Sequence, residues 1–145
     1  MKNISELRQD IVTGDWVVVA IGRSRRPHAF GRPAKKETLP PKKNCPFERL
    51  FRDALLVYDQ AGERFRLTPK DRRYLARHWW LQVVPNKYPA FGRHGICAVK
   101  RRMGPYQWED GVGFHEVVIT RDHERSIGRM TPHEVEIILR AYRNR

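Results

Sequence analysis

Apolar residues along the chain gather in short runs that are typical of β-strands. Four such runs predict strands at residues 16–20, 80–84, 96–99 and 114–120. The first run holds three consecutive valines after a glycine turn, so we expect that strand to be buried. Residues 54–67 contain two further runs around the turn-forming residues 59–62 and predict a β-hairpin. Residues 69–77 predict a short basic helix.

The last predicted element is an amphipathic helix near the C-terminus. Thr131 and Glu134 have the spacing of a capping box, and Pro132 occupies the first helical position. The predicted apolar face consists of Val135, Ile138, Leu139 and Tyr142. No stop signal follows, so the helix is expected to run to Arg145. Truncation of a longer chain and simple fraying explain such an ending equally well.

These elements together predict an α+β fold, with one helix packed on one face of an antiparallel sheet of about four to six strands. A length of 145 residues corresponds to one domain, 1–145. Residues 31–44 are rich in proline and lysine and predict an extended linker or surface strip. No run of 18 apolar residues and no signal peptide is visible, so we expect a cytoplasmic protein without a membrane span.

The net charge of the chain indicates a class of ligand that it could bind. The chain has 29 Lys and Arg residues against 16 Asp and Glu residues, for a net charge of +13. A field of this sign attracts phosphates, on a nucleic acid or on a small substrate. Charge alone leaves both alternatives open, together with the simpler one of a solvated basic surface.

Four local motifs, taken in order, narrow the possible functions of the chain. They are Leu7-Arg8-x-Asp10-x-x-Thr13-Gly14-x-Trp16 followed by Arg23-x-x-Arg26-Pro27; Cys45-Pro46-Phe47; Val83-Val84-Pro85-Asn86-Lys87-Tyr88-Pro89-Ala90; and Gly113-Phe114-His115-Glu116-Val117 followed by Asp122-His123. In this order the chain resembles the N-terminal half of the galactose-1-phosphate uridylyltransferases, a family of the histidine-triad superfamily. The resemblance covers 5–30 and 79–145, covers 31–47 loosely, and does not extend to 48–78.

The resemblance implies a histidine-triad-like sheet, or half-barrel, and a substrate site. The family moves UMP from UDP-glucose to a hexose-1-phosphate such as galactose-1-phosphate. By this resemblance Arg23 and Arg26 reach the nucleotide phosphates, while Asn86 contacts the nucleotide with Lys87 beside it. Without the resemblance, the arginines would be read as a solvated basic loop and Asn86 as a turn that ends a strand.

The resemblance also raises the question of zinc. In many members a Cys-x-x-Cys pair and two histidines hold a structural zinc ion, and the matching positions here are Cys45, Glu48 and His123. The carboxylate stands where the second cysteine would be, and the fourth ligand lies in a segment that this chain does not contain. Two clear ligands do not make a closed zinc site, so zinc binding is doubtful from the sequence. Cys97 is expected to be a small core residue.

The nucleophile of the family lies in a His-Pro-His-x-Gln motif, and no His-x-His occurs in this chain. The resemblance therefore implies that the C-terminal half is absent and that this chain alone is inactive. Like the family, it is expected to form a homodimer. The alternatives are a basic nucleic-acid-binding module on the same fold, which the ordered motifs disfavour, and a partner for a separately encoded second half.

Overall fold

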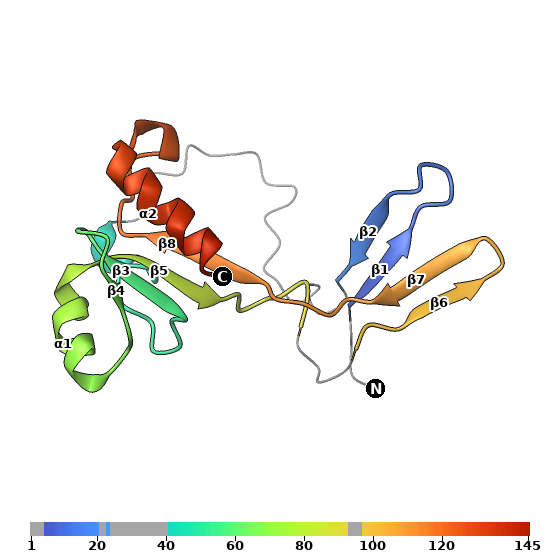
Figure 1. Ribbon diagram of the computed structural model, residues 1–145, viewed down its shortest axis with the longest axis horizontal. Helices are drawn as coiled ribbons and strands as arrows, with labels where there is room; N and C mark the ends of the chain where they lie inside the picture. The colour runs from blue at the N-terminus through green and yellow to red at the C-terminus, as the bar shows by residue number, and fades with distance from the viewer. Residues whose placement is uncertain (1–4, 21–22, 24–40, 93–96) are drawn as a thin grey trace. The chain divides into compact units, whose positions relative to one another are not determined.

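The computed structural model describes residues 5–20, 23, 41–92 and 97–145. The chain forms two compact units, Met1–Arg32 with Asn86–Glu116 and Pro33–Pro85 with Val117–Arg145. Each unit contains strands of one antiparallel four-stranded sheet, and the helices accompany the second sheet (Figure 1). The predicted α+β class is confirmed.

The first sheet has the strand order β2-β1-β7-β6. Its strands are β1 (Glu6–Gln9), β2 (Trp16–Val19), β6 (Lys100–Met103) and β7 (Tyr106–Asp110). The β1–β2 turn is held by the Asp10 carboxylate, which accepts the backbone N–H groups of Val12 and Thr13 at 2.7 and 3.0 Å. This is an Asx-type turn, which short acidic side chains favour.

Three of the expectations for this unit are wrong, and one of them is Cys97, which was expected in the core and is exposed. Of the strand predicted at 96–99, residue 96 lies outside the described residues and 97–99 are not a strand. The strand begins at Lys100, because pairing with β7 selects the hairpin rather than the apolar run before it. The strand predicted at 16–20 is present as β2, but it is an exposed edge strand and not a buried one. Trp16 and Val17 are 41% and 53% exposed.

The second sheet has the order β4-β3-β5-β8. Its strands are β3 (Leu56–Asp59), β4 (Arg64–Phe65), β5 (Trp79–Pro85) and β8 (Glu116–Thr120). The predicted hairpin is confirmed as β3–β4, and Gly62 in its turn has a φ of 84°, a value that favours glycine. Strands β5 and β8 confirm the runs predicted at 80–84 and 114–120, although β8 begins only at Glu116.

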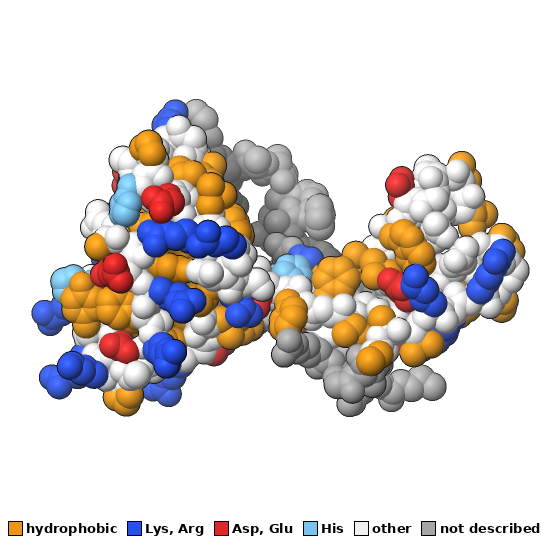
Figure 2. All heavy atoms as spheres, in the orientation of Figure 1, with side chains coloured by type: hydrophobic (Ala, Val, Ile, Leu, Met, Phe, Trp, Pro, Cys, Tyr) orange, Lys and Arg blue, Asp and Glu red, His pale blue; other side chains and the backbone are white. Residues whose placement is uncertain are grey.

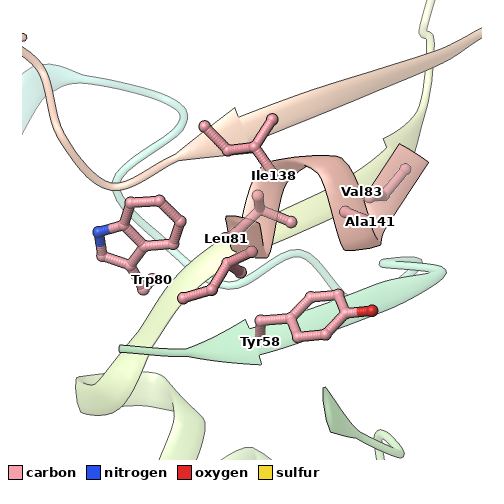
Figure 3. Packing of buried hydrophobic residues seen from close by; sticks show 7 residues of the cluster. Tyr58, Trp80, Leu81, Val83, Ile138 and Ala141 are labelled. Carbon is pink, nitrogen blue, oxygen red and sulfur yellow. The ribbon is translucent and has the colours of Figure 1, made fainter. Parts of the chain in front are cut away.

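Helix α2 (Pro132–Arg143) packs on one face of this sheet. Figure 3 shows Tyr58 from β3, three side chains of β5, and Ile138 and Ala141 from α2 gathered in one apolar cluster. The capping box is confirmed, because Thr131 Oγ1 accepts the Glu134 N–H and Glu134 accepts the Thr131 N–H. Burial of this cluster is the main source of stability for the helix.

The predicted apolar face of this helix is wrong by about one position. The buried residues are Glu134, Ile137, Ile138 and Ala141, whereas Leu139 and Tyr142 are 57% and 58% exposed. The expected run to Arg145 is also wrong. The helix ends at Arg143 and Asn144 caps it, with its N–H on the Arg140 carbonyl at 3.0 Å and its amide on the Tyr58 hydroxyl at 2.7 Å.

Helix α1 (Pro69–His78) confirms the predicted basic helix and contributes to a second core. Its Leu75 joins a buried cluster of Ala54, Val57, Trp79, Val84 and Ile119. Thr68 caps the helix through the Asp71 N–H at 3.2 Å. In the described part of the chain, no helix is long and apolar enough to cross a membrane. Figure 2 shows Lys and Arg side chains interspersed with apolar patches on its visible face.

Candidate functional site

The segment after β5 carries the candidate nucleotide contacts and is fixed by its own side chains. Pro85 ends the strand, and the Asn86 N–H donates to the His115 carbonyl at 2.9 Å. Asn86 Oδ1 then accepts the Tyr88 N–H at 2.9 Å. The turn expected at Asn86 as the simpler interpretation is therefore present. It uses only the carbonyl end of the side chain, and Asn86 Nδ2 has no hydrogen bond among the described residues.

His115 holds the other end of this segment. Its Nδ1 accepts the Ala90 N–H at 2.9 Å. In the neutral ring the proton must then lie on Nε2, because the acceptor nitrogen cannot carry it. Together with the backbone bond to Asn86, His115 fastens both ends of a five-residue loop. Sequence reasoning did not assign this role, since the two partners lie 25 residues apart and no local pattern links them.

Lys87 and Tyr88 form the outer part of the same loop. The Lys87 ammonium lies 5.5 Å from the centre of the Tyr88 ring, within the range of a cation–π contact. The loop therefore offers a cation, an aromatic ring and the Asn86 amide within three consecutive residues. This combination can bind a phosphate and a planar, polar base, which are the two parts of a nucleotide.

The two candidate arginines are only partly covered by the structure. Arg23 follows β2, and its N–H donates to the Ala20 carbonyl at 3.0 Å. Arg26 lies outside the described residues. Among the described residues, no contact joins the Arg23 side chain to Asn86 or Lys87.

Two of the three positions that match the family's zinc ligands, Glu48 and His123, form an ion-pair cluster with Arg121. Glu48 Oε2 lies 2.8 Å from His123 Nε2, and Glu48 Oε1 accepts Arg121 Nε at 3.2 Å. Burial raises the pKa of Glu48, but the hydrogen bonds from Arg121 and His123 outweigh it and hold the pKa below its ordinary value. The carboxylate thus ties the 45–48 loop to the end of β8.

This arrangement does not fit a zinc ion. A structural site needs four N or S ligands, whereas the described residues contain no group of three His, Cys, Asp or Glu side chains suited to a metal. Among the described residues, Cys45 is joined to this region only through its carbonyl, which accepts the Glu48 N–H at 3.3 Å. A guanidinium already bound to the carboxylate would also repel a cation placed beside it.

Comparison with known proteins finds a relative whose match includes the candidate residues. No protein-family model matches the chain, and no solved structure matches it. The chain is 32% identical over 142 residues to the ADP-glucose phosphorylase of Arabidopsis thaliana, a match that covers 97% of this chain. The match extends through both units and all of the candidate residues. The chain spans 38% of the length of that relative.

Proposed function

We propose that this chain supplies nucleotide-binding residues to a nucleotidyltransferase that acts on sugar nucleotides. The observation that carries the proposal is the similarity over 97% of the chain to an ADP-glucose phosphorylase, whose name specifies a sugar nucleotide and phosphate as reactants. The loop fixed by His115 supports it, because that loop presents an amide donor, a cation and an aromatic ring together.

In its finer form, the proposal is transfer of UMP from UDP-glucose to galactose-1-phosphate or another hexose-1-phosphate through a uridylyl-histidine. Arg23 and Arg26 would bind the phosphates, since a guanidinium matches two phosphate oxygens at once. Asn86 and Lys87 would contact the base and the ribose or phosphate. The relative's name points to an adenine rather than a uracil nucleotide, so the base is part of the test. Substrate binding is the appropriate measurement, because the chain holds no His-x-His nucleophile.

Replacing Asn86 with aspartate tests the proposed contact between Nδ2 and the nucleotide without removing the turn at Asn86. The variant keeps the Oδ1 acceptor for the Tyr88 N–H and loses the Nδ2 donor. We expect it to weaken binding of UDP-glucose or ADP-glucose about tenfold, the cost of one buried polar contact. Isothermal titration with both ligands, and with the uncharged nucleosides uridine and adenosine, measures this. A loss seen with the nucleosides as well shows that the added negative charge is not the cause.

Two kinds of control accompany that measurement. One changes how the loop is held in position, and the other removes a positive charge elsewhere. His115→Leu removes the acceptor for the Ala90 N–H and should weaken binding, whereas His115→Asn, which keeps an acceptor near the Nδ1 position, should restore most of it. Arg102→Ala, on the exposed strand β6, removes one positive charge away from the loop. Equal losses in Asn86→Asp and Arg102→Ala, or tighter binding of mixed single-stranded DNA than of either sugar nucleotide, would contradict the proposal.

We also propose that the chain forms a homodimer and holds no structural zinc. The first sheet leaves large apolar side chains uncovered, among them Trp16, Val17, Met103 and Tyr106. Uncovered apolar area of this kind favours association. Sedimentation velocity should show a species of twice the chain mass, and a monomer at high concentration would contradict the dimer. Metal analysis of the purified chain should find less than stoichiometric zinc, as expected when Glu48 is bound to Arg121.

A further inference from the structure

A polar pocket lies within the second unit and includes none of the residues proposed for nucleotide binding. Its volume is about 350 Å³, within the range of small-molecule sites. The β3–β4 turn, the last turn of α1, the start of β5 and Arg121 surround it. We call it the Arg77 pocket and define it by Asp59, Tyr74, Arg77, His78, Trp79 and Arg121.

The charges around this pocket are predominantly positive. Arg77 has no ion pair among the described residues, and Arg121 shares one carboxylate, Glu48, with His123. Among the described residues, Asp59 is the only acidic residue of the lining. Its oxygens are directed to the Glu63 N–H at 3.0 Å and the Tyr74 hydroxyl at 3.4 Å, so it neutralises neither arginine.

The helix end beside the pocket does not cancel this charge. The C-terminus of α1 carries partial negative charge on its last carbonyls, which would oppose an anion. Arg121 Nη1 donates to the Arg77 carbonyl at 2.6 Å and so satisfies one of them. The same bond fixes the guanidinium of Arg121 beside the last turn of α1.

The lining residues also include a buried tryptophan and two stacked rings. Trp79 is 1% exposed, and its indole Nε1 has no hydrogen-bond partner among the described residues. Buried donors nearly always have an acceptor, and none for this donor lies among the described residues. The rings of Tyr74 and His78 stack at 4.5 Å, and the Arg121 guanidinium lies 5.5 Å from the centre of the Trp79 ring.

We propose that the Arg77 pocket binds a phosphate monoester, with the phosphate on Arg77 and Arg121 and the organic part against the Tyr74 and His78 rings. Arg77 offers its guanidinium fork to a phosphate, and Arg121, whose Nε and Nη1 already donate to Glu48 and to the Arg77 carbonyl, adds Nη2. The volume exceeds what a bare phosphate needs and suits an attached ring. Nucleoside monophosphates and hexose phosphates share this chemistry, and the experiment separates them.

The test uses the indole N–H signals of the full chain in nitrogen-15 NMR. The Trp79 signal is assigned by its disappearance in Trp79→Phe. Titration with AMP, UMP or glucose-6-phosphate should shift this signal to saturation, with inorganic phosphate about tenfold weaker because it lacks the ring contacts. Preference for the nucleotides or for the sugar phosphate identifies the organic part.

Matched variants test whether the binding depends on Arg77 in particular. Arg77→Ala should weaken the binding about tenfold, as expected for loss of one charged phosphate contact. Arg73→Ala, one turn earlier on the exposed surface of α1 and outside the pocket lining, should leave it unchanged. Asn86→Asp should also leave it unchanged, which separates this pocket from the proposed nucleotide loop. Equal losses in Arg73→Ala and Arg77→Ala, or a shift that sodium sulfate reproduces at the same ionic strength, would overturn the proposal.

Discussion

Replacing Gln82 with leucine should lower the free energy of unfolding of the second unit by about 3 kcal/mol. The variant would leave two inward-facing backbone groups unpaired, and the gain from a larger apolar side chain would offset part of that cost. Gln82 is fully buried in the middle of β5. Its Oε1 accepts the Phe51 N–H at 2.9 Å and its Nε2 donates to the Arg49 carbonyl at 3.0 Å. One side chain thus supplies both hydrogen bonds that hold the 49–51 loop on the sheet.

The measurement should report on this unit alone. Urea unfolding followed through the Trp79 and Trp80 indole signals does so, because both residues lie at the start of β5. Hydrogen exchange of the Phe51 amide is a second readout, and its protection should be lost in the variant. Gln60→Leu makes the same chemical change at an exposed position and should alter stability by less than about 0.5 kcal/mol. A Gln82→Leu protein that keeps both its stability and its Phe51 protection would refute this account.

Sequence patterns located most elements of the second unit because their signals are local. The capping box at Thr131 and the proline after it set the start of α2 without reference to any other part of the chain. The buried face of that helix was missed because one of its positions is Glu134. A carboxylate is buried there only because Arg125, nine residues earlier, pairs with it, and no hydrophobic pattern carries that information.

The first unit was harder to predict for a related reason. Strand β6 has the sequence Lys-Arg-Arg-Met, which has no apolar alternation. It forms because it pairs along β7, and because Arg101 binds the Asp110 carboxylate at 2.7 Å. That contact requires the hairpin to exist first, so it cannot be inferred from the run of basic residues.

In the candidate site, too, local motifs predict some residues, and contacts between distant parts of the chain determine the others. Asn86 and Lys87 were assigned from a motif, and the structure places them on one loop beside Tyr88. Glu48 was identified only as a replacement for a cysteine. That its carboxylate would meet both Arg121 and His123, more than 70 positions along the chain, depends on how β8 ends against the 45–48 loop.

Replacing Arg125 with methionine should lower the free energy of unfolding at pH 7 by about 2 kcal/mol, in line with hydrogen bonds between charged groups at a half-exposed site. Arg125 donates to both carboxylate oxygens of Glu134, at 3.0 and 2.6 Å, and to Asp122 at 2.5 Å. Methionine keeps the apolar stem and removes all three bonds. Glu134 is 7% exposed, so it would be left as a buried carboxylate with only the Thr131 cap as its partner.

The same cluster sets how the unit responds to acid. The Arg125 hydrogen bonds and the Thr131 N–H lower the pKa of Glu134 from 4.5 to about 2. For Asp122, the backbone N–H groups of Arg125 and Glu124 lower the pKa from 3.8 to about 2. A carboxyl group whose pKa is lowered by folding adds stability above its unfolded pKa and loses it as the pH falls toward the folded value. The wild-type unit should therefore lose stability as the pH falls from about 5 to about 2.

Arg125→Met should make that loss of stability shallower, because the pKa of Glu134 would return toward its ordinary value. Urea unfolding at a series of pH values, read from the Trp79 and Trp80 indole signals, gives the slope. Glu134→Gln is the matched variant: it keeps a side-chain acceptor for the Thr131 N–H and cannot titrate. It should flatten the profile while retaining the helix start. Parallel pH profiles in the wild type and both variants would mean that this cluster does not govern the acid response, because a lowered pKa, an ordinary pKa and no titration at position 134 would then have given one slope.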